Sequence, residues 1–331
     1  GSSYMFVTGP DVVKTVTSEE VTAEQLGGAE THTTISSVAD GAFDNDLEAL
    51  AEIRRLVGFL PSHNAAGLPQ LPRDDDPART TPALDSLIPE NANMPYDMRE
   101  LVTSLADHGD FFELQEDFAK NILTGFVRLN GSPVGVVANQ PMVLAGCLDI
   151  DSSRKAARFV RFCDAFNISL LTLVDVPGFL PGKDQEHGGI IRHGAKLLFA
   201  YAEATVPKMT LVTRKAYGGA YLAMSCKHLQ SDYNIAWPTA ELAVMGAEGA
   251  VNIIHRREIA AADDDEKENV RLQLVDEYKS KFGDPYVAAK NGWLDDVIEP
   301  SETRLRLIRS LRILSSKREW SPPKKHGNIP L

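Results

Sequence analysis

Arg214–Ser225, RKAYGGAYLAMS, is the stretch that decides the fold, and it follows the apolar run Met209–Thr213. The apolar run predicts a buried strand, the glycine pair a tight turn, and the residues after it the start of a helix. A helix N-terminus presents unpaired backbone N–H groups and a partial positive charge, so such a turn can hold a developing oxyanion without any side chain. By itself, the pattern also fits an ordinary strand-to-helix turn that binds no ligand.

The same strand-then-helix unit recurs on both sides of this stretch. The expected strands, each with the helix that follows it, are 134–139 and 152–166, 169–175 and 189–204, 209–213 and the glycine-turn helix, and 234–237 and 249–262. Continuous apolar strands that alternate with helices are typical of a buried, largely parallel sheet in an α/β protein. Ligands of such folds bind where the loops leave the carboxyl ends of the strands.

Before this sheet, the sequence predicts one helix and one linker. Residues 46–59 have apolar positions at helical spacing, with Asp44 or Asp46 available as a cap. Residues 61–84 are rich in proline and aspartate, and we expect them to be extended and solvated. The acid run Asp74–Asp76 is interpreted as part of that solvated linker and not as a metal site.

Composition narrows the possible partners. The net charge is −12, and the sequence has no basic tract, no long uncharged apolar span and no signal-peptide pattern. We therefore expect a cytoplasmic protein that binds neither nucleic acid nor a membrane. Cys147, Cys163 and Cys226 are widely spaced and form no CxxC pair, which favours reduced thiols in or near the core. The chain starts with GSSYMF and enters a strand-like segment, Phe6–Pro10, at once, so we expect a fusion scar or a fragment.

Several long motifs occur together in a fixed order. They are ANQP at 138–141, VDVPGF at 174–179, GIIRHGAK at 189–196, RKAYGGAY at 214–221, AWPT at 236–239 and MGAEGAVNII at 245–254. With these motifs the sequence resembles the carboxyltransferase (beta) subunit of biotin-dependent acyl-CoA carboxylases, of the propionyl-CoA and acetyl-CoA carboxylase type. The resemblance covers almost the whole chain.

The resemblance implies a crotonase-like fold, the ClpP/crotonase ββα superhelix. It implies that 1–60 is the C-terminal remnant of an N-terminal carboxyltransferase domain, 61–84 a linker and 85–331 the C-terminal carboxyltransferase domain. The first domain's glycine pair would lie upstream of residue 1. The implied partners are a biotin carboxylase, a biotin carboxyl carrier and an acyl-CoA, in a homo-oligomer that is a hexamer, a trimer of dimers, when full-length. Biotin and a coenzyme A thioester are the implied cofactor and substrate, with no metal.

The chemistry implied is transfer of the carboxyl group from carboxybiotin to the α-carbon of an acetyl-, propionyl- or butyryl-CoA through an enolate, with the biotin ureido nitrogen taking the α-proton. The backbone N–H groups of Gly219 and Ala220 match the family's second-domain oxyanion donors. Leu222 matches the position that sets acyl preference, although a leucine packed inward on a helix face remains an alternative. The other residues matching the biotin and acyl-CoA pocket are Gly178, Phe179, Tyr217, Gly218, Tyr221, Gly249 and Ala250.

Alternative functions stay open. A biotin-dependent decarboxylase or transcarboxylase would share these motifs, and the chain could be an inactive carrier-binding or assembly fragment. A biotin-independent hydratase would need paired glutamates, for which only Glu241 and Glu248 are near. His187, His193 and His255 have no triad partner at suitable spacing, so we expect surface or capping roles. The basic residues that could meet CoA phosphates or the carrier, with a solvated face as the alternative, are Arg192, Lys196, Arg256 and Arg257.

Overall fold

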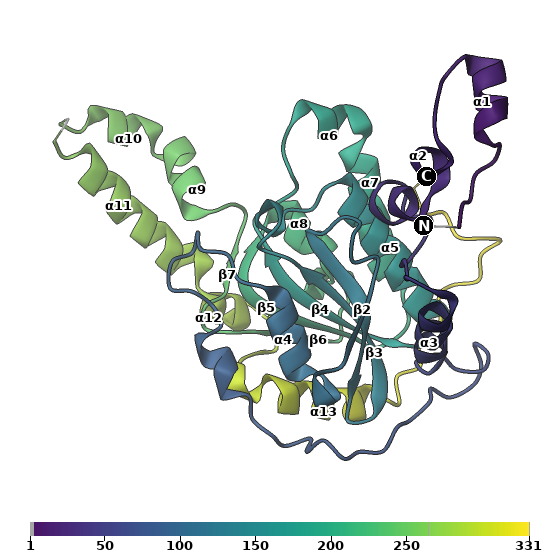
Figure 1. Cartoon of the computed structure of the whole chain (residues 1–331). Helices are drawn as coiled ribbons and strands as arrows, with labels where there is room; N and C mark the ends of the chain where they lie inside the picture. The colour runs from purple at the N-terminus through teal and green to yellow at the C-terminus, as the bar shows by residue number, and fades with distance from the viewer. Residues whose placement is uncertain (1–2, 264, 331) are drawn as a thin grey trace.

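The computed structural model describes residues 3–263 and 265–330, and its centre is one mixed sheet (Figure 1). The strand order is β1-β2-β3-β4-β5-β6-β8, with β7 pairing with β5 beyond the end of β6. The strands are β1 (Phe111–Leu114), β2 (Ile122–Leu129), β3 (Ser132–Asn139), β4 (Ser169–Val176), β5 (Lys208–Tyr217), β6 (Tyr233–Ala236), β7 (Glu241–Ala243) and β8 (Asp296–Val297). The four predicted strands are confirmed as β3 to β6, and these run parallel.

The antiparallel pair formed by β1 and β2 was not predicted from the sequence. The signal for the β2–β3 hairpin was present, because Asn130 and Gly131 form its two-residue turn with φ of 52° and 81°. Asn-Gly is the residue pair that such positive-φ hairpin turns favour. All residues of β2 are buried, and its neighbour β3 is nearly so, so neither strand has the alternating pattern of a half-exposed hairpin.

Helices cover both faces of the sheet. The α-helices are α1 (Pro10–Thr17), α2 (Ala23–Gly27), α3 (Asp46–Val57), α4 (Met98–Leu105), α5 (Ile150–Ala165), α6 (Lys183–Gly188), α7 (Ile190–Glu203), α8 (Gly218–Ala223), α9 (Ala247–Ile254), α10 (Arg256–Ala261), α11 (Lys267–Tyr278), α12 (Pro285–Lys290) and α13 (Thr303–Leu314). Short 3-10 helices lie at Pro82–Ser86, Asp107–Gly109, Leu144–Gly146, Lys227–Leu229 and Pro300–Glu302, and π-helices at Thr31–Ile35 and Lys279–Gly283.

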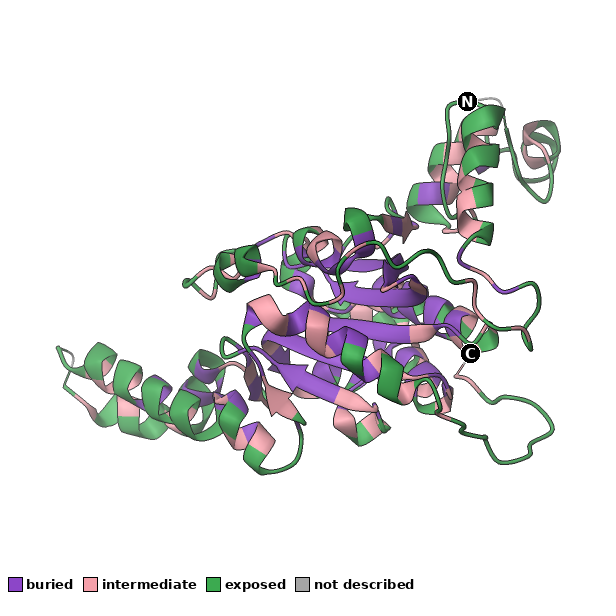
Figure 2. Ribbon diagram, turned by 90° about the horizontal axis from the view of Figure 1, so that it is seen from below, coloured by how far each residue is buried: buried purple, intermediate pink, exposed green. Residues whose placement is uncertain are grey.

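The sheet separates two apolar cores, one on each of its faces. One contains the inner sides of α5, α7 and α8, and the other contains α4 and α13. Figure 2 shows the sheet as the buried centre of the molecule. The helix predicted at 189–204 is confirmed as α7, with Ile190, Gly194 and Leu197 among its buried residues, whereas Ile191 is 80% exposed.

The segment predicted as the fourth crossover helix does not cover the sheet. Residues 249–262 belong to α9 and α10, which with α11 form a helical arm that projects from the body (Figure 1). The arm has its own small core of Ala247, Val251, Leu274 and Val275. The apolar spacing therefore correctly predicted helical structure in this segment. Its apolar side chains, however, pack within the arm and not on the sheet.

The strand-like stretch expected at Phe6–Pro10 is wrong: residues 6–9 form no strand, and the helix α1 begins at Pro10. Pro10 is the first residue of α1, a position that suits proline because its missing N–H would have no helical partner. The helix predicted at 46–59 is confirmed as α3, but its cap is Asn45 and neither Asp44 nor Asp46. Phe59 is buried in the core on the α5 side, so the end of this segment docks on the sheet domain.

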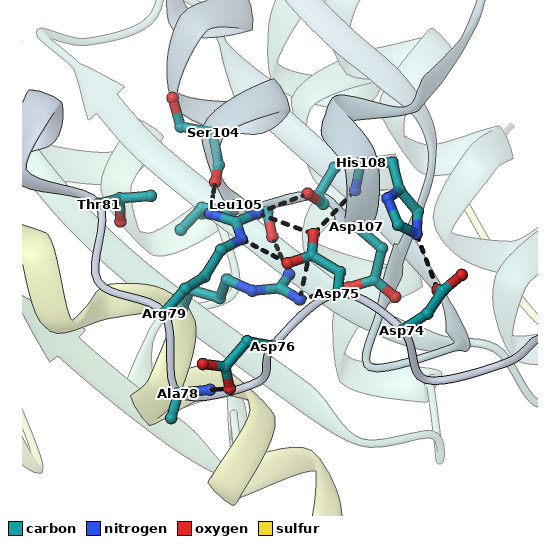
Figure 3. A network of polar contacts seen from close by, with 12 residues as sticks. Asp74, Asp75, Asp76, Ala78, Arg79, Thr81, Ser104, Leu105, Asp107 and His108 are labelled. Carbon is teal, nitrogen blue, oxygen red and sulfur yellow. Dashed lines mark hydrogen bonds and ion pairs between the residues drawn. The ribbon is translucent and has the colours of Figure 1, made fainter.

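In the linker, Asp74 and Asp76 of the acid run are exposed as expected, but Asp75 is not. Asp75 accepts hydrogen bonds from the Arg79 guanidinium at 2.7 Å and from the His108 backbone N–H at 2.9 Å (Figure 3). Its carboxylate also lies 3.7 Å from the fully buried guanidinium of Arg304, which pairs with Asp107. Asp75 can leave solvent because the half-buried Arg79 of the linker and the buried Arg304 of α13 neutralise its carboxylate.

Candidate active site

The strand-turn-helix reading of Arg214–Ser225 is confirmed, since β5 ends at Tyr217 and α8 begins at Gly218. Gly218 has φ of +56°, and a Cβ placed there would lie 2.8 Å from the Val244 carbonyl oxygen. The position therefore needs glycine for its backbone conformation and for its close contact with the segment that leads into the arm.

The first turn of α8 is open at its N-terminus. Tyr217 is the N-cap residue in an extended conformation, and no side chain caps the helix. The N–H groups of the first turn have no partner within the helix, so they are available to an acceptor outside it. Gly219 is exposed, whereas Ala220 is fully buried at its side chain, which leaves the backbone as the group that this turn can offer.

The loop after β4 lies against this turn. Leu148 holds the loop, because its N–H donates to the Gly178 carbonyl at 3.1 Å and its carbonyl accepts from the Leu180 N–H at 2.7 Å. The Phe179 ring lies 2.9 Å from where a Cβ on Gly194 would be and 3.9 Å from that of Gly219. The structure thus brings the Phe179 ring next to the glycine turn, while Gly178 precedes it in the same loop.

The two tyrosines of the turn differ in their surroundings. The Tyr217 hydroxyl donates to the Glu241 carboxylate, and burial together with that carboxylate raises the pKa of Tyr217 well above its usual value. The Tyr221 hydroxyl is buried and has no hydrogen-bond partner among the described residues, and burial raises the pKa of Tyr221. Both hydroxyls stay protonated at neutral pH, so neither can act as a base.

The remaining predicted residues lie around this turn. Leu222 is 40% exposed, so it is not the inward-packed helix leucine that was the alternative. Gly249 and Ala250 lie on α9, just after the Val244–Gly246 segment that contacts the turn. A Cβ on Gly249 would meet nothing within 4 Å, whereas Ala250 is buried.

The comparisons with known proteins agree with this geometry. The carboxyl transferase domain model matches residues 1–329. The chain belongs to the carboxyl transferase domain family. It is 64% identical over 330 residues to the propionyl-CoA carboxylase beta chain of Roseobacter denitrificans, covering all of this chain and 64% of that one. It is 56% identical to the methylmalonyl-CoA decarboxylase subunit alpha of Propionigenium modestum, over all of this chain and 63% of that one.

Solved structures give the fold of this carboxyl transferase domain. A transcarboxylase 12S structure, described as a hexamer with methylmalonyl-coenzyme A and methylmalonic acid bound, superposes with a TM-score of 0.95 at 50% identity. The match covers 99% of this chain and 62% of the transcarboxylase chain. The α/β fold is therefore crotonase-like, as expected. The chain spans less than two thirds of the length of the relatives named here.

Two charged residues of the carboxyl transferase domain were quoted within motifs, yet sequence reasoning gave them no role. Asp175 is the penultimate residue of β4 and is 1% exposed, and its Oδ2 accepts from the Arg214 Nε on β5 at 3.0 Å. Burial raises the pKa of Asp175, while the Arg214 charge opposes that shift. A charged residue at the end of each of two apolar strands was the signal that could have revealed this pair.

The histidines show no acid/base constellation. His187 is exposed, and His255 pairs with Glu258 on the arm. The Nδ1 of His193 is buried without a hydrogen-bond partner among the described residues. Burial, and then the charges of nearby Lys196, Arg154 and Arg192, lower the pKa of His193.

The acidic residues do not form the pair that a hydratase would need. Glu241 is occupied by the Tyr217 hydroxyl, and Glu248 is exposed on α9. Within residues 3–263 and 265–330, no group of three His, Cys, Asp or Glu side chains is arranged to hold a metal ion. In the same part of the chain, no helix is both long and apolar enough to cross a membrane. The three cysteines are free, and Cys163 and Cys226 are buried.

Proposed function

We propose that the chain is the carboxyltransferase component of a biotin-dependent acyl-CoA carboxylase. In this role it moves a carboxyl group from carboxybiotin to the α-carbon of a short-chain acyl-CoA. The observation that carries the proposal is the uncapped N-terminus of α8 beside the Phe179 loop. Family membership and 64% identity to a propionyl-CoA carboxylase beta chain support it.

Backbone donors fit the chemistry that this reaction demands. Removing an α-proton from a thioester leaves negative charge on an oxygen, and preorganised N–H groups stabilise such an oxyanion in a site that excludes water. We assign Gly219 and Ala220 as these donors, with Gly178, Phe179, Tyr217, Gly218, Tyr221, Gly249 and Ala250 as the surrounding pocket. When bound, biotin on its carrier supplies the carboxyl group. Gly218 and Gly219 let a ligand approach the main chain closely because they carry no side chain.

The wider assembly is part of the proposal. We propose a biotin carboxylase and a biotin carboxyl carrier as partners, a hexameric homo-oligomer for the complete protein and a cytoplasmic location. Residues 1–60 would end one carboxyltransferase domain, 61–84 would link, and 85–331 would form the next. The hexamer described for transcarboxylase 12S supports the oligomer.

The second candidate function is that of a biotin-dependent decarboxylase or transcarboxylase subunit. The identities of 56% to a methylmalonyl-CoA decarboxylase subunit and 50% to a transcarboxylase support this second candidate. The test combines the complete protein containing this chain with a biotin carboxylase, biotinylated carrier, ATP, bicarbonate and propionyl-CoA. We expect biotin-dependent carboxylation. A separate assay offers methylmalonyl-CoA in place of propionyl-CoA. No turnover in either assay contradicts the proposal. Decarboxylation of methylmalonyl-CoA without carboxylation of propionyl-CoA favours the second candidate.

Acyl preference gives a finer prediction at Leu222. Aspartate at this position should shift the ratio of kcat/KM towards propionyl-CoA over acetyl- and butyryl-CoA, by about ten-fold, the size expected for one altered pocket contact. Leu47→Asp, at an exposed leucine in the first turn of α3, is the matched control and should leave the ratio unchanged. An unchanged ratio in Leu222→Asp removes this residue from the acyl pocket.

A further inference from the structure

β5 is irregular just before the glycine turn. The register pairs Val174 with Val212 and Val176 with Ala216, so two steps along β4 match four steps along β5. The two extra residues of β5 form a bulge, which bends a strand and leaves some of its backbone groups outside the ladder. At the same place β5 stops pairing with β6 and starts pairing with β7.

The Asp175 carboxylate fills the bulge. Its Oδ1 accepts the Lys215 backbone N–H at 3.1 Å and its Oδ2 accepts the Arg214 Nε at 3.0 Å. The Arg214 guanidinium also donates to the Met94 carbonyl at 2.8 Å and lies over the Tyr96 ring, 5.0 Å from its centroid. A single buried carboxylate therefore satisfies two consecutive residues of the bulge.

Side chains satisfy the other displaced backbone groups as well. The Asp175 N–H donates to Asn139 Oδ1 at 3.2 Å, and the Thr213 hydroxyl donates to the Val174 carbonyl at 3.1 Å. The Thr239 hydroxyl donates to the Thr213 carbonyl at 2.7 Å. Buried backbone groups without partners are costly, so this set holds the bulge in one conformation.

Both strands lead from the bulge towards the site. β4 ends at Val176, directly before the loop with Gly178 and Phe179, and β5 ends at Tyr217, directly before the Gly218–Ala220 turn. The register of the bulge thus fixes how far the turn reaches relative to the Phe179 loop.

We propose that Asp175 and Arg214 are positioning residues for carboxyl transfer, which hold the β5 bulge so that the N–H groups of Gly219 and Ala220 face the Phe179 loop at the right distance. The inference rests on the proposed function. Neither residue touches the reacting atoms, and both act through the backbone. A misplacement of about 1 Å in such a site can cost about a hundred-fold in rate.

The test uses Asp175→Ala and Asp175→Asn in the complete carboxylase. Asp175→Ala should lower kcat by about a hundred-fold with little change in KM for propionyl-CoA, because binding contacts away from the turn persist. Asp175→Asn keeps an oxygen for the Lys215 N–H and should restore part of kcat. Hydrogen exchange of the Lys215 amide reads the bulge without any activity, and we expect it to be fast in Asp175→Ala and slow in Asp175→Asn.

Thr172→Val is the matched control. Thr172 is also buried on β4, but its hydroxyl bonds the Tyr201 hydroxyl on α7, away from the bulge. It should lower stability and leave kcat unchanged. The inference is overturned if Asp175→Ala folds and keeps a kcat within about two-fold of the parent, or if kcat falls only with the folded fraction. An inactive parent enzyme instead overturns the proposed function, while the exchange data still report on the bulge.

Discussion

At the scale of single residues, the site depends on places where a side chain would intrude. Gly218 needs a positive φ and lies close to the Val244 carbonyl, and Gly194 leaves room for the Phe179 ring. The sequence marked these glycines as parts of motifs, but only the packing tells which neighbour each one admits. Replacing such a glycine by alanine therefore tests the contact that its missing side chain allows.

Gly194→Ala should displace the Phe179 ring. The added Cβ would lie 2.9 Å from the edge of the partly exposed ring, closer than real contacts allow, so the ring must move. The displaced ring should lower kcat. The strain opposes the roughly 1 kcal/mol that alanine gains over glycine inside a helix such as α7, so we expect no net gain in stability. Steady-state kinetics and chemical denaturation measure the two effects. Gly67→Ala is the control, since a Cβ there meets nothing within 4 Å, and an unchanged kcat in Gly194→Ala would contradict the contact.

His193 should make stability depend on pH. Burial and the charges of Lys196, Arg154 and Arg192 lower its pKa in the folded chain, so below about 6.5 the unfolded chain binds a proton that the folded chain does not. Stability should therefore fall as the pH drops from the usual histidine pKa towards the lowered one. The measurement is the difference in unfolding free energy between the parent and His193→Gln from pH 8 to pH 5. A constant difference would contradict the assignment.

At the scale of elements, α13 is fastened to the linker and to the end of α4 through Arg304. This guanidinium is fully buried, donates to the Leu105 carbonyl and the Asp107 carboxylate, and lies near Asp75. Asp107 in turn accepts the N–H of Gly131 at 2.7 Å, in the β2–β3 turn. Arg304 thus joins α13 to the linker and to the end of α4, and through Asp107 to the β2–β3 turn; Figure 3 shows Asp75, Leu105 and Asp107 gathered at this place.

Arg304→Met should destabilise the chain by about 3–5 kcal/mol, because it leaves the Asp107 carboxylate buried without a counter-charge, whereas Asp75 keeps Arg79. Arg306→Ala on the same helix is the matched control. Its side chain is 36% exposed and pairs with Glu302 and Asp296, so its loss should cost less than about 1 kcal/mol. Urea denaturation of both variants checks the contrast, and similar losses would argue against the buried pairing.

At the scale of the whole molecule, a well-packed sheet domain carries a thinly packed arm. The arm's core has four buried residues, whereas the sheet strands are buried along nearly their whole length (Figure 2). Few buried contacts make local opening easier. The arm begins beside the glycine turn, because Val244 and Gly246 contact Gly218 and Tyr217.

Amides of α9 and α11 should therefore exchange with solvent much faster than those of β3 to β5. Hydrogen exchange with mass spectrometry measures this directly. α13 is the internal comparison, since it is also near a chain end but packs on the sheet core, and it should exchange slowly. Protection of the arm equal to that of β4 would show that the arm is as stable as the sheet.

The parallel strands, the helices after them, the glycine turn and the family could be predicted from the sequence, because apolar runs and glycine motifs are local signals. The β5 bulge, the buried Asp175–Arg214 pair, the docking of Asp75 and the arm could not. These depend on which segments meet in space: a charge reads as solvated until a buried partner is known, and an apolar helix face does not say what it packs against. Tertiary structure alone decided how the Gly218–Ala220 turn is held beside Phe179.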